Sequence, residues 1–218
     1  MDRWQEVSAE LETDLENLEK LNRYFGSYSL VRFFLRRWFR TGKLVRLLDL
    51  CTGFGDIPRF IVNWCRLHRI PIEITAVDQQ PATLELARKK SSSYPEISYL
   101  TADVLDFLPL APVDFVFCSL ALHHFSDAAA IRLIRQTELM TRGKILFADL
   151  ERSDLGLLGI QALTAVVFRE PMTRFDGRLS MQRAFSFPEM KRLAGAAGWQ
   201  GFGHRRFLIC RQAIWRET

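Results

Sequence analysis

The feature that most constrains this chain is an alternation between two kinds of segment, which begins after Lys43. Short apolar runs rich in Val, Ile, Leu and Phe lie at 44–50, 72–78, 97–103, 113–120 and 143–150. Stretches with helical periodicity separate them, at 57–68, 81–90 and 127–140. Such runs are typical of parallel strands covered on both faces, and their alternation with helices indicates βαβ units. We therefore predict an α/β fold built on a doubly wound sheet.

The end of the chain extends this sheet. The stretch "SFPEMKRLAGAAGW" predicts a helix that begins near Ser186 and ends before Gly198. Two more strand-like segments follow, at 199–204 and 206–214. With the five earlier runs they bring the predicted sheet to seven strands, in a Rossmann-like arrangement.

Residues 1–40 precede the alternation and predict two amphipathic helices. The first has an acidic outer face, is expected to end at Gly26, and carries apolar residues at helical spacing: Val7, Leu11, Leu15, Leu18, Leu21 and Phe25. The second combines aromatic residues with Arg32, Arg36, Arg37 and Arg40. Its aromatic face either packs on the domain, with the arginines solvated, or residues 28–40 contact an anionic membrane surface. We predict that residues 1–40 form a helical cap or lid on a domain spanning 41–218.

Residues 151–185 interrupt the alternation and are interpreted as an insertion. An apolar helix is expected at 155–168, followed by a charged loop with turns. Insertions at the carboxyl edge of such a sheet commonly build the substrate pocket. We expect the apolar helix to line or roof a hydrophobic cavity together with four aromatic residues, Phe33, Phe34, Trp38 and Phe39.

Composition narrows the class of protein. The 218 residues carry a net charge of +5 with a pI near 9.2, which alone would allow an anionic partner. No apolar run reaches the roughly 18 residues that span a bilayer, and the acidic start does not resemble a signal peptide, so we expect a cytoplasmic protein. The four cysteines are far apart and form no CxxC pair, which indicates neither a disulfide framework nor a zinc site.

The stretch "LLDLCTGFGDIP" places a two-glycine turn at the end of the first strand. Gly53 and Gly55 permit positive φ there, Asp56 can cap the next helix, and Pro58 suits its first turn. A dinucleotide fingerprint needs a third glycine where Pro58 stands, and the charge of Asp56 would repel a diphosphate. The turn therefore favours a nucleoside without phosphate.

Aspartates also end the next two strands. Asp78 can accept hydrogen bonds from both ribose hydroxyls, and Asp103 can accept from an adenine amino group. A lone aspartate at such a place is usually a helix cap or a solvated turn residue. Their occurrence in series with the glycine turn favours a nucleoside site.

These residues resemble the class I S-adenosylmethionine-dependent methyltransferases. "DLCTGFGDI" is similar to their first motif, "AVD" to the second, "TADVLDF" to the third and "VDFVFCSLALHHF" to the fourth. "GFGDIP" and "LALHHF" resemble the branch that holds quinone methyltransferases and small-molecule methyltransferases associated with polyketide synthases. The latter also share "LEKLNRYFG" and "FDGRLSMQRAFSFPE". Cys51 departs from the family by replacing the first glycine of its pattern.

The resemblance implies S-adenosylmethionine as the cofactor and assigns residues to it. The implied cofactor-binding residues are Asp49, Cys51, Thr52, Gly53, Gly55, Asp78, Gln79, Asp103, Val104, Ser119 and Leu120. The resemblance implies that Asp49 and the glycine turn surround the methionine and ribose of the cofactor. It also implies that Asp103 and Val104 contact the adenine and that Ser119 lies beneath the sulfonium. Methyl transfer from this cofactor requires no metal.

A histidine pair follows the fourth predicted strand, where the acceptor is expected. A phenol or enolic carbon is helped by a base that removes its proton, and histidine is suited to that near neutral pH. We expect His123 to face the acceptor and His124 to hydrogen-bond within the protein, although both could be structural. Asp149, Asp176 and Arg183 are further polar candidates, each more often part of a loop-fixing ion pair.

The fourth motif also bears on the acceptor. Base methyltransferases of the family carry Asn or Asp followed by two prolines and an aromatic residue there, whereas this chain has "SLALHH", which argues against nucleic acid. We predict methyl transfer to a small hydrophobic aromatic or polyketide-derived acceptor, with O-methylation of a phenol as the expected reaction. C-methylation of a quinone precursor and a non-catalytic cofactor-fold binding protein stay open as alternatives. A nicotinamide oxidoreductase is disfavoured by the missing third glycine.

Overall fold

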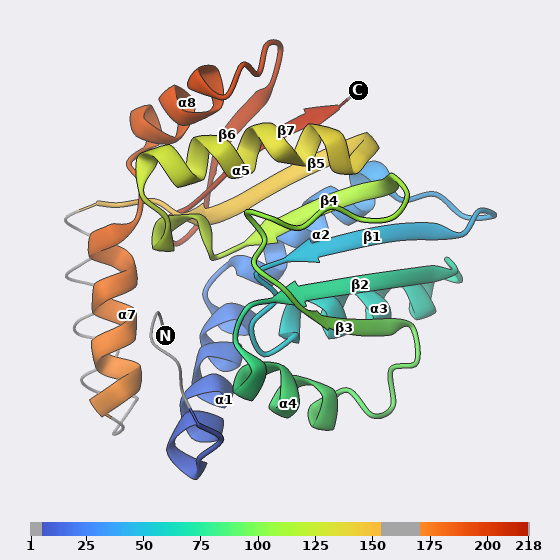
Figure 1. Ribbon diagram of the computed structural model, residues 1–218, viewed down its shortest axis with the longest axis vertical. Coiled ribbons are helices and arrows are strands. Elements are labelled where there is room, and N and C mark those ends of the chain that lie inside the picture. Colours follow the sequence, from blue (N-terminus) through green and yellow to red (C-terminus); the bar gives the residue numbers. More distant parts are fainter. Residues whose placement is uncertain (1–5, 154–170, 218) are drawn as a thin grey trace.

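The computed structural model describes residues 6–153 and 171–217, and within them seven strands form one sheet (Figure 1). The strands are β1 (Val45–Leu50), β2 (Ile72–Asp78), β3 (Ile97–Thr101), β4 (Val113–Ser119), β5 (Thr141–Leu150), β6 (Gly203–Phe207) and β7 (Arg211–Glu217). Their order is β3-β2-β1-β4-β5-β7-β6. The first five strands are parallel, while β7 runs antiparallel to β5 and β6. The predicted seven-stranded α/β fold is confirmed.

Helices cover both faces of the sheet, as the apolar runs predict. One face packs against α2 (Ser27–Trp38) and α3 (Asp56–His68), and the other against α5 (Asp127–Met140) and α8 (Phe187–Ala196). Successive side chains of a strand point to opposite faces. Leu47 accordingly lies in one hydrophobic cluster and Leu48 in the other. A further helix, α4 (Pro81–Lys90), connects β2 to β3.

The C-terminal hairpin differs from the sequence prediction. Residues 199–202 are not a strand, and the turn lies at 208–210 rather than near residue 205. Its sequence, Leu-Ile-Cys, holds no turn-forming residue, yet Ile209 and Cys210 adopt positive φ. Gly203 begins β6, and the indole of Trp215 occupies the space that a side chain would need there. Around α8 the prediction is confirmed, since Ser186 caps the helix and Gly198 follows it with φ +94°.

The two N-terminal helices, predicted as one cap, occupy different places. Helix α1 (Ala9–Tyr24) stands beside the carboxyl ends of the parallel strands, next to α7 (Pro171–Arg183) (Figure 1). Helix α2 lies against the sheet, where Phe34, Trp38 and Phe39 are buried in the core. The prediction that these aromatic residues line a cavity is therefore wrong, because the sheet face offers them a larger apolar surface. The packing interpretation of α2 is confirmed.

The end of the insertion is a helix rather than the predicted loop. Helix α7 includes the Asp176-Gly177 pair that suggested a turn. Its buried Thr173 donates a hydrogen bond to Asp14 of α1 at 2.7 Å, so packing against α1 outweighs the local turn signal. The apolar helix expected at 155–168 lies outside the described residues. Among the helices that the structure describes, none has both the length and the hydropathy to cross a membrane.

Candidate active site

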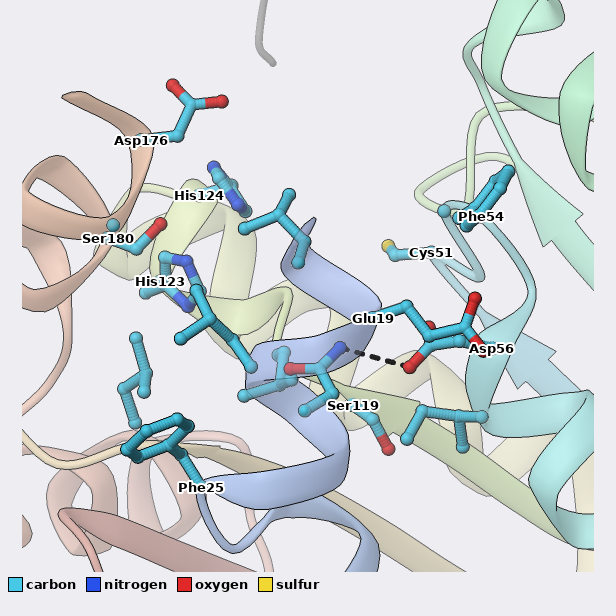
Figure 2. Close-up of a pocket in the computed structure, with 18 of the residues that line it drawn as sticks. Glu19, Phe25, Cys51, Phe54, Asp56, Ser119, His123, His124, Asp176 and Ser180 are labelled. Atoms are coloured by element: carbon cyan, nitrogen blue, oxygen red, sulfur yellow. Dashed lines mark hydrogen bonds between the residues drawn. The ribbon is translucent and has the colours of Figure 1, made fainter. Parts of the chain in front are cut away.

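A cavity of about 580 Å³ opens where the parallel strands end. Helices α1 and α7 form its outer walls, while the loops after β1 and β4 and the start of β7 form its floor. Figure 2 shows His123, His124 and Ser180 on one side and Cys51, Phe54 and Asp56 on the other. We call the second side the cofactor end and the first side the acceptor end.

The glycine turn forms the cofactor end. Gly53 has φ +54°, its N–H donates to Asp78 Oδ2 at 2.8 Å, and nothing lies within 4 Å of where its Cβ would be. Gly55 has φ +70°, but the Tyr99 hydroxyl fills the corresponding space beside it. Gly53 thus leaves room for a ligand, whereas Gly55 allows close packing and is absent from the cavity lining.

Asp56 does not cap α3 as predicted. The N-cap residue is Gly55, and the side chain of Asp56 instead accepts a hydrogen bond from Asn22 of α1 at 3.1 Å (Figure 2). Glu19 of α1 accepts from Arg59 of α3 at 2.9 Å, and both of these side chains are largely buried. These contacts fasten α1 to the helix that begins in the glycine turn. Glu19 and Asn22 were not predicted as site residues, because their only signal in the sequence is a polar position beside the apolar stripe of α1.

Two buried oxygens at the cofactor end lack hydrogen-bond partners among the residues described. They are Asp49 Oδ1, at the end of β1, and Ser119 Oγ, at the end of β4. Burial raises the pKa of Asp49 to about 7, and the nearby charges of Asp56 and Asp78 act in the same direction. Buried polar atoms are normally satisfied, so this end of the cavity fits a polar ligand. Cys51, Thr52 and Leu120, which were also predicted, line the same cavity.

The predicted ribose and adenine residues lie farther along the same edge, outside the cavity lining. Asp78 accepts hydrogen bonds from the N–H groups of Gly53 and Gln80, which holds the glycine turn in place. Asp103 is exposed and accepts from Leu105 N–H at 2.9 Å. Gln79 is exposed beside Asp78, and Val104 is buried in the core. Contacts of these residues with a nucleoside stay predictions.

His123 and Asp149, predicted as separate candidates, form a buried pair at the acceptor end. The short helix η1 (Leu122–His124) places His123 Nδ1 at 2.7 Å from Asp149 Oδ1. Asp149 also accepts from the His123 N–H at 2.9 Å and the Leu150 N–H at 2.7 Å. Burial alone would raise the pKa of Asp149, but the charge of His123 and these hydrogen bonds outweigh it and lower that pKa. An ionised carboxylate only accepts, so Nδ1 carries the proton.

The remaining imidazole nitrogen of His123, Nε2, has no hydrogen-bond partner within the part of the chain that is described. In the neutral form of the ring, with its one proton on Nδ1 facing Asp149, Nε2 presents a lone pair. The ring of His124 lies 4.2 Å from that of His123, and Asp176 and Ser180 of α7 line the cavity nearby (Figure 2). Arg183 is exposed at the end of α7 and does not line this cavity.

Sequence reasoning also missed a buried arginine in the cavity. Arg211 begins β7, is 7% exposed and lines the acceptor end. An arginine within the predicted strand 206–214 gives no signal of burial, because only the tertiary structure brings the α1–α2 junction over it.

Comparison with known proteins identifies the domain. Residues 47–142 match the family described as a methyltransferase domain. The glycine turn, Asp78, Ser119 and His123 all lie within the matched residues.

Two curated relatives each match part of the chain. The chain is 32% identical over 91 residues to 2-phytyl-1,4-naphtoquinone methyltransferase of Thermosynechococcus vestitus, which covers 42% of this chain and 39% of that protein. It is 30% identical over 81 residues to 5-methylorsellinic acid synthase of Aspergillus terreus, which covers 36% of this chain and 3% of that protein. The chain thus spans well under half the length of either relative.

Solved structures share the fold of the whole chain. The plantazolicin methyltransferase BpumL, solved with S-adenosylhomocysteine, superposes with a TM-score of 0.69 at 14% identity, covering 94% of this chain and 87% of that one. Together with the domain match, such neighbours support S-adenosylmethionine as the cofactor. The unpartnered Asp49 and Ser119 oxygens and the open space at Gly53 fit this group.

Proposed function

We propose that the protein is an S-adenosylmethionine-dependent methyltransferase that acts on a small hydrophobic acceptor, aromatic or polyketide-derived, by O-methylation of a phenol. The observation that carries this proposal concerns His123, which lines a mainly apolar cavity. Its Nε2 atom has no hydrogen-bond partner among the residues described. The names of the two relatives, a naphthoquinone methyltransferase and a methylorsellinic acid synthase, favour a small-molecule acceptor.

The His123–Asp149 pair suits the side chain of His123 to accept a proton. Asp149 fixes the ring orientation and the tautomer, so that Nε2 can take the proton of an acceptor hydroxyl. The ionised carboxylate then stabilises the imidazolium that forms. Asp49, the Gly53 turn and Ser119 would hold S-adenosylmethionine, which would supply an activated methyl group when bound. The enclosing α1 and α7 align the acceptor and exclude water.

Helix α1 is proposed as the lid that covers the acceptor. Leu15, Leu18 and Phe25 of α1 line the cavity, whereas the aromatic residues of α2 are buried under the sheet. Contact of residues 28–40 with an anionic membrane stays a prediction. It would depend on charge alone, since the arginines of α2 are exposed and its aromatic face is largely covered.

Methyl transfer is tested by incubating the protein with cofactor carrying a deuterated methyl group and a panel of phenols and enolic ketides. Mass spectrometry and fragmentation distinguish O- from C-methylated products, and therefore a phenol acceptor from a quinone precursor. We expect His123→Ala to lower turnover about 10² to 10⁴-fold, the usual contribution of a general base, while cofactor affinity changes little.

His68→Ala is the matched control, because His68 stacks on Trp64 away from the cavity. This substitution should leave turnover unchanged. Equal turnover of His123→Ala and wild type would exclude His123 as the base. Cofactor binding without transfer to any member of the panel would favour the non-catalytic binding protein.

A further inference from the structure

The guanidinium of Arg211 is buried at the acceptor end with only part of its hydrogen-bonding capacity used. Nε donates to Ser27 Oγ at 3.0 Å, and Nη1 donates to the Ile209 carbonyl at 3.2 Å. Within the described residues Nη2 makes no hydrogen bond, although a guanidinium carries five donor hydrogens. Three donor hydrogens therefore remain, one on Nη1 and two on Nη2, and one from each terminal nitrogen can face a ligand.

The charge of Arg211 is also not neutralised by direct contact. Within residues 6–153 and 171–217 its guanidinium makes no salt bridge. Asp149 acts on Arg211 through its charge, and no hydrogen bond or ion pair joins the two side chains within the described residues. Burial lowers the pKa of Arg211 to about 10, so the side chain is still protonated at neutral pH. A buried cation without a direct counter-ion is costly, which indicates that a ligand supplies the missing charge.

None of the acidic groups that line the cavity, which are Glu19, Asp49, Asp56 and Asp176, forms an ion pair with Arg211 in the described part of the chain. Glu19 is held by Arg59, and Asp56 by Asn22, both at the cofactor end. Arg211 belongs to the acceptor end instead, where the strand register pairs it with Leu150. Leu150 follows Asp149, the partner of His123. The guanidinium and the proposed base therefore belong to one region of the cavity.

We propose that Arg211 binds a carboxylate of the acceptor, which makes the substrate class a phenolic or enolic carboxylic acid. A guanidinium fork matches the two oxygens of a carboxylate, and one uncompensated positive charge matches a monoanion. A phosphate dianion would carry one more negative charge than the single guanidinium compensates. That this acid is a methyl acceptor rests on the proposed function. Binding of a carboxylate by Arg211 does not depend on it.

Arg211 could instead serve only to hold the fold. It ties β7 to Ser27 at the α1–α2 junction, and its side chain packs close to Gly26. Ser27→Ala removes that tie and leaves the charge. Arg211→Gln removes the charge, and Arg211→Lys keeps a charge without the fork. Comparison of these variants separates a structural role from ligand binding.

The experiment titrates 3-hydroxy-2-naphthoate and its neutral primary amide into the full chain by calorimetry, without cofactor. We expect the wild type to bind the acid about 10 to 100-fold more tightly than the amide, the range for hydrogen bonds to a charged group. Arg211→Gln should bring this ratio close to one, and Arg211→Lys should give an intermediate ratio. Ser27→Ala and the exposed Arg205→Gln should keep the wild-type ratio.

Three results would overturn the inference: equal binding of acid and amide by the wild type, binding of neither, or an unchanged ratio in folded Arg211→Gln. If Arg211→Gln does not fold, the wild-type ratio and the intermediate ratio of Arg211→Lys decide. A carboxylate preference that depends on Arg211, found in a chain that transfers no methyl group, would sustain this inference while the proposed function fails.

Discussion

Two buried aspartates occupy equivalent places in the sheet yet have opposite chemistry. Asp49 is the penultimate residue of β1 and Asp149 that of β5, and they are 2% and 1% exposed. Asp149 accepts three hydrogen bonds and has a lowered pKa, whereas Asp49 keeps an unpartnered oxygen and has a pKa raised to about 7. The position of a carboxylate at a strand end therefore does not determine its pKa. Its hydrogen-bond partners and neighbouring charges do.

The difference distinguishes the two ends of the cavity. At the acceptor end the protein itself completes the aspartate, because Asp149 and His123 satisfy each other and leave one nitrogen for the acceptor. The cofactor end is left incomplete, because Asp49 Oδ1 and Ser119 Oγ lack partners among the described residues. Each prediction below tests this contrast.

The largest effect is expected at Asp149. Asp149→Asn removes a charged acceptor of three hydrogen bonds and should lower the free energy of unfolding by about 3 to 5 kcal/mol at neutral pH. Because the folded pKa is lowered, this stabilisation is present above the unfolded value of roughly 4 and is lost as pH falls through the folded pKa. Urea unfolding at several pH values measures it, and cofactor affinity should be unchanged. If the difference in unfolding free energy between the wild type and Asp149→Asn stayed constant down to low pH, Asp149 would not be ionised in the folded protein.

Asp49 should give the opposite pH dependence. Its folded pKa is raised from 3.8 to about 7, so the folded state loses stability as pH rises between these values. Asn mimics the protonated form. As pH rises from 4 to 8, the free energy of unfolding of Asp49→Asn should therefore increase by roughly 2 to 4 kcal/mol relative to that of the wild type. The same unfolding series provides the test, without cofactor. Parallel curves for the two proteins would show that Asp49 has an ordinary pKa.

A smaller effect is expected at Asp78. Asp78→Ala removes a carboxylate that holds the Gly53 and Gln80 N–H groups and is predicted to accept from the ribose hydroxyls. Affinity for S-adenosylmethionine should fall by about 1 to 3 kcal/mol, measured by calorimetry. Asp114→Ala, which removes an exposed carboxylate at the opposite end of the strands, is the control. Unchanged affinity in folded Asp78→Ala would remove Asp78 from the cofactor site.

Much of the cofactor end could be predicted from the sequence because its residues are adjacent in the chain. Asp49, Thr52 and Gly53 belong to one turn, and the order of strands brings Ser119 beside them. The acceptor end could not be predicted in the same way. Its groups come from α1, η1, α7 and the start of β7, which no local pattern connects, and the turn after β6 has no turn-forming residue.

By itself, the sequence determined the alternation of strands and helices, the seven-stranded sheet and the glycine turn, because hydrophobic periodicity and glycine conformation act over a few residues. Only the tertiary structure decided which polar groups are buried together. It paired His123 with Asp149, turned the aromatic residues of α2 into the core, and enclosed Arg211 beside the cavity. Burial and charge compensation depend on neighbours that are distant in sequence, so the chemistry of this site appears only once the chain is folded.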